Sequence, residues 1–173
     1  MLRKSENIFL VGLMGAGKST IGKRLAELSN KRFLDSDKEI EIRTGVNIDL
    51  IFEIEGEEGF RKRECKIIEE LSALDNIILA TGGGAVLNAD NRRHLHQGGT
   101  IIYLQASAEQ LTQRTAKDKK RPLLKIEDRL GKIEELLKIR APLYEEAADF
   151  IINTDDHTVM QIVNIISKKL KIA

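Results

Sequence analysis

A parallel α/β fold is predicted for this chain of 173 residues by the alternation of apolar runs with helical patterns. Stretches with apolar residues at helical spacing separate short apolar runs at 7–11, 32–35, 76–81, 100–104 and 149–153. Such alternation is typical of a parallel sheet, because each connecting helix returns the chain to the same end of the sheet. The length and the hydrophobic fraction of 42% fit a single domain over residues 1–173.

The helical stretches have recognisable ends. Asn47 and Asn88 each precede a helical pattern and can cap it, since an asparagine side chain accepts hydrogen bonds from free backbone N–H groups. Gly98 and Gly99 follow the second of these patterns, where glycine commonly ends a helix. The pattern at 158–172 keeps its apolar residues on one face, as expected of a helix that covers a sheet.

Charge and composition exclude several classes of protein. Lys and Arg total 28, and Asp and Glu total 27, so the formal net charge of +1 favours neither nucleic acid nor an anionic membrane as a partner. No stretch is apolar over the length of a membrane span, and no apolar signal-peptide region is present. The single cysteine, Cys65, fits a reducing compartment and a packing role. We therefore expect a cytoplasmic protein. We also expect a monomer.

Residues 12–19, GLMGAGKS, match the phosphate-loop pattern Gly-x-x-x-x-Gly-Lys-Ser/Thr between a predicted strand and a predicted helix. The loop's N–H groups and the helix N-terminus favour phosphates, Lys18 reaches the β- and γ-phosphates, and the Ser19 hydroxyl ligates Mg²⁺. An ordinary glycine-rich turn would require neither the Lys-Ser pair nor its position. The residues expected to contact ATP here are Gly15, Ala16, Gly17, Lys18, Ser19 and Thr20.

A phosphate loop alone does not identify the reaction. A GTPase would need further motifs, but NKRF at 30–33 lacks the aspartate that reads guanine, and DRLG at 128–131 lies in a helical pattern. A larger ATP-driven machine would need additional domains, for which this chain has little room. A small-molecule kinase fits better.

Two acidic residues follow the second predicted strand. Because parallel strands end at the same edge of the sheet, Asp35 and Asp37 are expected near the phosphate loop. Asp35 can hold Mg²⁺, through water, and Asp37 can orient an acceptor hydroxyl or take its proton. The alternative is a helix N-cap with a favourable charge in the first turn.

Two arginines and three glycines complete the candidate acceptor site. Arg61 and Glu64 are three residues apart in a helical pattern and can pair, although a surface salt bridge would explain the same spacing. Arg140 stands between a helical stretch and Pro142, and two fixed guanidinium groups would suit a carboxylate. The glycines 82–84 follow the third strand, where bare backbone implies that something approaches closely.

Taken together and in order, these motifs resemble those of the shikimate kinases over nearly the whole chain. The motifs are GLMGAGKST, FLDSD, IFEIEGEEGFRKRE, ATGGGAV, RPLL and RAPLYEEAAD. The resemblance implies a three-layer sandwich like that of nucleoside monophosphate kinases, with a five-stranded parallel sheet in the order 2-3-1-4-5. It also implies ATP-dependent phosphorylation of the 3-hydroxyl of shikimate, giving shikimate 3-phosphate and ADP in chorismate biosynthesis.

The resemblance assigns a role to each candidate residue. Asp37 would meet the hydroxyls of shikimate, Arg61 and Arg140 its carboxylate, and the backbone of Gly82, Gly83 and Gly84 its ring. A lid at about 114–126 would bring Arg121 onto the transferring phosphate, and Arg114 with the turn at 153–156 would face the adenine. Two alternatives are a kinase for another hydroxylated acid, such as gluconate, and a regulatory subunit that has kept the phosphate loop.

Overall fold

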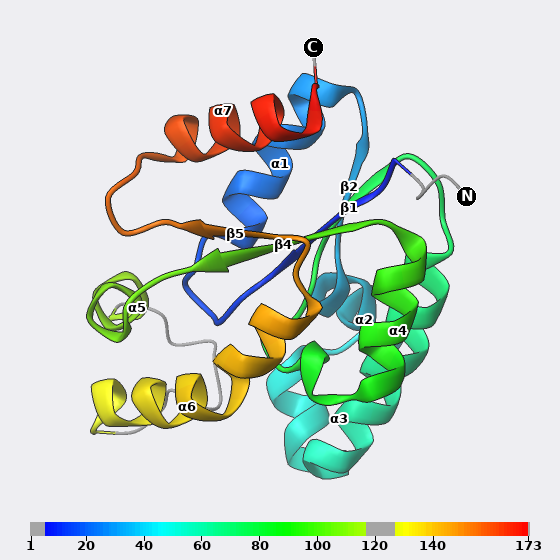
Figure 1. Ribbon diagram of the computed structural model, residues 1–173. Coiled ribbons are helices and arrows are strands. Elements are labelled where there is room, and N and C mark those ends of the chain that lie inside the picture. Colours follow the sequence, from blue (N-terminus) through cyan, green and yellow to red (C-terminus); the bar gives the residue numbers. More distant parts are fainter. Residues whose placement is uncertain (1–5, 117–126, 173) are drawn as a thin grey trace.

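The computed structural model of the protein describes residues 6–116 and 127–172. Most of the expected lid, including Arg121, lies outside these residues. Five parallel strands pair in the order β2-β3-β1-β4-β5 (Figure 1), so the predicted fold class and strand order are confirmed. The strands are β1 (Ile8–Val11), β2 (Arg32–Asp35), β3 (Ile77–Ala80), β4 (Thr100–Gln105) and β5 (Phe150–Asn153).

Helices cover both faces of the sheet, with α1 and α7 on one face and α3, α4 and α6 on the other (Figure 1). The helical elements are α1 (Lys18–Ser29), α2 (Ser36–Thr44), α3 (Ile48–Ser72), the 3-10 helix η1 (Ala85–Leu87), α4 (Ala89–Gly98), α5 (Ala108–Thr115), α6 (Arg129–Ala147) and α7 (Val159–Leu170). Among the residues described, none of these helices is both long enough and apolar enough to cross a membrane.

The core explains why the central strands are short, continuous apolar runs. Every residue of β1 and β3 is buried, as expected for strands covered by helices on both faces. All five strands contribute to one buried apolar cluster, together with residues from the helices on both faces. The sheet is therefore held from both sides and supports the loops at its edges.

The predicted helix caps are present. The Asn47 side chain accepts a hydrogen bond from the Leu50 N–H, and the Asn88 side chain accepts from Asp90 and Asn91. A kink divides α3 into two helical segments. They meet at Gly56, whose φ of 71° and ψ of −178° are not helical, and the second segment continues to Ser72. Arg61 and Glu64 lie in the part of α3 that follows this kink, so the kink sets the direction of the helix segment that carries them.

Candidate active site

The predicted site residues gather at one edge of the sheet, where the strands end. The phosphate loop follows β1, Asp35 ends β2 and the glycines 82–84 follow β3, and these strands are adjacent in the sheet. A cavity of about 960 Å³ opens at this edge, which is where ligands usually bind to parallel sheets. The predicted residues that line it are Gly15, Ala16, Gly17, Lys18, Ser19, Thr20, Asp35, Asp37, Arg61, Gly82, Gly83, Gly84, Arg114 and Arg140.

The phosphate loop curls around the start of α1. Gly17 precedes the helix with a φ of 95°, in the left-handed region that glycine adopts most readily. Within the described part of the chain no side chain caps the first N–H groups of α1, so these groups can receive an anion. The Lys18 ammonium donates hydrogen bonds to the carbonyl oxygens of Gly12 at 2.5 Å and Leu13 at 3.0 Å. It is thereby held over the loop, at the wall of the cavity.

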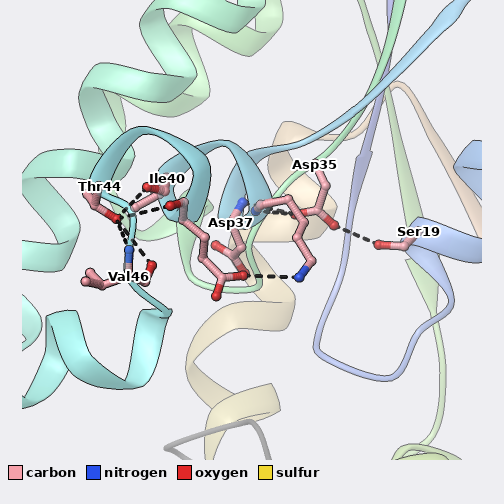
Figure 2. A network of polar contacts seen from close by, with 8 residues as sticks. Ser19, Asp35, Asp37, Ile40, Thr44 and Val46 are labelled. Atoms are coloured by element: carbon pink, nitrogen blue, oxygen red, sulfur yellow. Dashed lines mark hydrogen bonds and ion pairs between the residues drawn. The ribbon is translucent and has the colours of Figure 1, made fainter.

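Ser19 and Asp35, the predicted metal ligands, are in direct contact. Ser19 Oγ donates a hydrogen bond to Asp35 Oδ2 at 2.8 Å (Figure 2). The other oxygen of Asp35 accepts from the N–H groups of Asp37 at 3.0 Å and Lys38 at 3.2 Å, so Asp35 also caps α2. The helix-cap interpretation is correct for Asp35, but it engages only one of the two oxygens. Hydroxyl and carboxylate oxygens suit Mg²⁺, which needs few protein ligands when phosphates and water complete its shell.

Asp37 lies in the first turn of α2, facing Gly82 and Glu64. A Cβ on Gly82 would lie 2.7 Å from Asp37 Oδ1 and 2.8 Å from Glu64 Oε2. Both distances are too short for non-bonded atoms, so a Cβ here would displace both carboxylates from their present positions against the backbone. The site therefore brings together two acidic groups that are far apart in the sequence.

Arg61 is held by two carboxylates of its own helix. Its Nη1 donates to Glu64 Oε1 at 2.8 Å and its Nη2 to Glu57 Oε1 at 3.3 Å. The side chain of Glu64 is 1% exposed and that of Arg61 is 21% exposed. Burial raises the pKa of Glu64, and the charges of Arg61 and Arg140 oppose that rise. The predicted pair is confirmed, and it is a largely buried pair, unlike the surface salt bridge that was its alternative.

The third glycine of the triplet also makes room for a side chain. A Cβ on Gly84 would clash with the guanidinium group of Arg61. The sequence suggested that glycine was needed because a ligand approaches the backbone. In the structure the side chains of Asp37, Glu64 and Arg61 already occupy the space beside the first and third glycines.

Arg140 has different surroundings from Arg61. It is 3% exposed, and no ion pair joins it to any residue within 6–116 and 127–172. Its Nη1 lies 3.5 Å from the point that a Cβ on Gly83 would occupy. A buried guanidinium group that forms no ion pair loses much of its hydration, and an anion would offset that loss. Its position at the cavity therefore suits an anionic ligand.

Arg140 lies within α6, contrary to the expectation that the helix ends before Pro142. The helix continues through Pro142 to Ala147, although proline cannot donate the helical hydrogen bond. Buried contacts on one face compensate, since Leu136, Arg140 and Tyr144 are spaced four residues apart. Sequence reasoning missed Tyr144 because it did not carry the helix past the proline.

Arg114 joins the phosphate loop to the turn after β5. Its guanidinium group donates to the Gly15 carbonyl oxygen at 3.4 Å, to Thr154 Oγ1 at 3.1 Å and to the Thr154 carbonyl oxygen at 3.2 Å. The structure thus brings together Arg114 and the turn at 153–156, which the sequence analysis had grouped at the adenine side.

Comparison with known proteins places the chain in the shikimate kinase family. The sequence profile of the shikimate kinase family matches residues 14–171. A shikimate kinase of Nitrosococcus oceani is 57% identical over 165 residues, which cover 95% of this chain and 87% of that protein. A shikimate kinase of Histophilus somni is 52% identical over 164 residues, which cover 94% of each protein.

The solved structures agree with the sequences. A shikimate kinase from Acinetobacter baumannii in complex with shikimate has a TM-score of 0.93 and 48% identity to this chain. The match covers 96% of this chain and 94% of that one.

Proposed function

The chain belongs to the shikimate kinase family, and from this premise we propose that it transfers the γ-phosphoryl group of ATP to the 3-hydroxyl of shikimate. The products are shikimate 3-phosphate and ADP, and the reaction serves the biosynthesis of chorismate and the aromatic amino acids. A relative of known structure, 48% identical to this chain, is described as a complex with shikimate, which supports the choice of acceptor.

The observation that carries the acceptor site is the buried guanidinium group of Arg140, which has no ion pair among the described residues. The carboxylate of shikimate would supply the missing charge. Arg61 approaches the same glycine triplet from α3, so both guanidinium groups can donate to that carboxylate. Asp37, at the first glycine, would then face the ring hydroxyls.

On the donor side, the residues Gly15 to Thr20 would hold the phosphates of ATP, with Lys18 at the β- and γ-phosphates. Ser19 and Asp35 would hold Mg²⁺, which neutralises charge on the phosphates when it is bound. Arg114 and the turn at 153–156 would border the adenine. Arg121, outside the described residues, would contact the transferring phosphate.

Asp37 would act mainly by orienting the acceptor hydroxyl. Phosphoryl transfer passes through a loose transition state, in which little proton transfer is needed before the bond to the leaving group weakens. Positioning of the attacking oxygen is then the larger contribution. The position of Asp37 at the start of α2, against Gly82, would hold its carboxylate in one place for this purpose.

A coupled assay of ADP release tests the function. Purified protein with Mg-ATP should release ADP rapidly with shikimate and hardly at all with gluconate or with no acceptor. Phosphorus NMR of the product should place the phosphate on the 3-hydroxyl, and EDTA should stop the reaction until Mg²⁺ is restored. Rapid turnover with gluconate would favour another sugar-acid kinase, and ADP release with no acceptor would point away from a kinase of small acids.

The oligomeric state and location are further proposals. We expect the enzyme to act as a monomer in the cytoplasm and without nucleic acid. Light scattering coupled to gel filtration should give a mass near that of one chain, 19.5 kDa.

A further inference from the structure

Tyr144 is a buried residue of α6 that contacts the glycine triplet. Its side chain is 0% exposed, and its ring packs against Tyr103 with a centroid distance of 4.9 Å. The phenol hydroxyl donates a hydrogen bond to the carbonyl oxygen of Gly83.

The direction of this hydrogen bond is set by the Gly83 carbonyl oxygen, which can only accept, and Arg140 one helical turn earlier in α6 does not reverse it. A guanidinium group only donates hydrogen bonds, so any contact with the Tyr144 oxygen leaves the phenol proton free for the carbonyl. Burial raises the pKa of Tyr144 well above its usual range, and the charge and hydrogen bonding of Arg140 only partly oppose this rise. Tyr144 therefore remains a donor at neutral pH.

The Gly83 carbonyl belongs to the same peptide unit as the Gly84 N–H. The two groups of a trans peptide point in opposite directions, so a carbonyl held by Tyr144 turns the Gly84 N–H away from Tyr144. Gly84 lines the cavity, whereas Tyr144 is buried. This N–H has no hydrogen-bond acceptor among residues 6–116 and 127–172, so it can donate to a ligand.

Three successive glycines need such an anchor. Glycine populates more backbone conformations than any other residue, so the peptide between Gly83 and Gly84 could rotate if nothing held it. We propose that Tyr144 is a positioning residue that fixes this peptide, so that the Gly84 N–H and the Arg140 guanidinium group address the same carboxylate of the acceptor. The proposal rests on the proposed function and adds a residue to it.

The test compares Tyr144→Phe with Tyr103→Phe. Both changes remove one phenol oxygen from the same ring pair, but the Tyr103 hydroxyl makes no hydrogen bond with a described residue. Tyr144→Phe should raise the KM and the calorimetric Kd for shikimate about tenfold, the usual effect of losing a hydrogen bond to a charged group. Nucleotide affinity should change less than twofold, and Tyr103→Phe should change neither affinity by more than twofold.

A neutral acceptor separates positioning from general damage. The amide of shikimate lacks the carboxylate charge, so Tyr144→Phe should weaken binding of the acid much more than binding of the amide. Equal weakening of both, or effects that match those of Tyr103→Phe, would overturn the proposal. If wild type neither binds nor phosphorylates shikimate, the proposed function itself fails, which is a different result.

A measurement on the wild type covers the case in which Tyr144→Phe does not fold. In protein labelled with ¹⁵N-glycine, the Gly84 amide proton should shift downfield when shikimate binds, as expected of a new hydrogen bond to a carboxylate. The amide analogue should produce a much smaller shift. A Gly84 amide that responds equally to both acceptors, or to neither, would show that this N–H does not face the carboxylate.

Discussion

Replacing Arg61 and Arg140 by methionine, one at a time, should weaken shikimate binding alike but affect the stability of the ligand-free protein differently. Arg61 pairs at 2.8 Å with Glu64, whose side chain is 1% exposed. Without Arg61 that buried carboxylate loses its nearest cation. Arg140 is 3% exposed and has no ion pair among the described residues, so its removal breaks no such pair.

The size of the difference follows from these surroundings. Breaking a fully buried pair from one side costs about 3–5 kcal/mol. Arg61 is 21% exposed, and the charge of Arg140 also acts on Glu64, so we expect a smaller loss for Arg61→Met, about 2–3 kcal/mol. Arg140→Met removes a desolvated charge and retains an apolar side chain, so the free energy of unfolding should change by less than about 1 kcal/mol.

Urea unfolding of the ligand-free variants measures the stability, and calorimetry measures the shikimate affinity. Each variant should lose about 1.5–3 kcal/mol of acceptor binding, or about 10- to 150-fold in Kd, with nucleotide binding little changed. The control is Arg61→Met combined with Glu64→Met, which removes both charges and should recover most of the stability lost by Arg61→Met alone. Equal losses of stability for the two single variants would refute the distinction drawn between the arginines.

Three other changes test the rest of the site. Lys18→Ala should lower turnover by orders of magnitude with the fold intact, and a variant above about a tenth of wild-type turnover would contradict its role. Asp37→Asn should greatly lower kcat in the coupled assay with ATP affinity little altered, whereas unchanged turnover would leave Asp37 only a favourable charge at the start of α2. Gly82→Ala should lower turnover, and it should lower the free energy of unfolding by about 1 kcal/mol or more, because its Cβ meets two carboxylates. Urea unfolding measures the second effect. Gly83→Ala is the matched control for stability, since its nearest atoms lie at 3.5 Å, and an equal loss there would count against the steric explanation.

The fold could be predicted because its signals are local. Apolar runs marked all five strands, and the asparagines at 47 and 88 marked helix starts, since both kinds of signal act within a few residues. The phosphate loop was equally clear, because its spacing and its place between strand and helix lie within one short segment. Position at the strand ends then brought Asp35 and Asp37 to the same edge.

The surroundings of each site residue could not be predicted, because they depend on contacts between distant segments. Spacing allowed Arg61 and Glu64 to pair but did not reveal how deeply Glu64 is buried. Nor did it distinguish Arg61, which has protein carboxylates, from Arg140, which has no ion pair in the described part of the chain. Pro142 was taken as a helix boundary because proline usually breaks helices, but the buried face of α6 outweighs that preference.

In the glycine triplet, the missing side chains let other groups approach the backbone closely, but they leave the backbone itself less rigid. Gly82 and Gly84 admit side chains from α2 and α3. A Cβ on Gly83 would lie 3.5 Å from Arg140 Nη1 of α6 and 3.5 Å from the Met14 nitrogen of the phosphate loop. The acceptor side of the cavity, at Arg140, and the nucleotide side, at the phosphate loop, therefore both border Gly83, which has no side chain. A Cβ at Gly83 fits the ligand-free protein at ordinary contact distances, but it would stand in the cavity between the two sides. The cost of Gly83→Ala should thus appear in turnover and not in stability, whereas Gly82→Ala should show both.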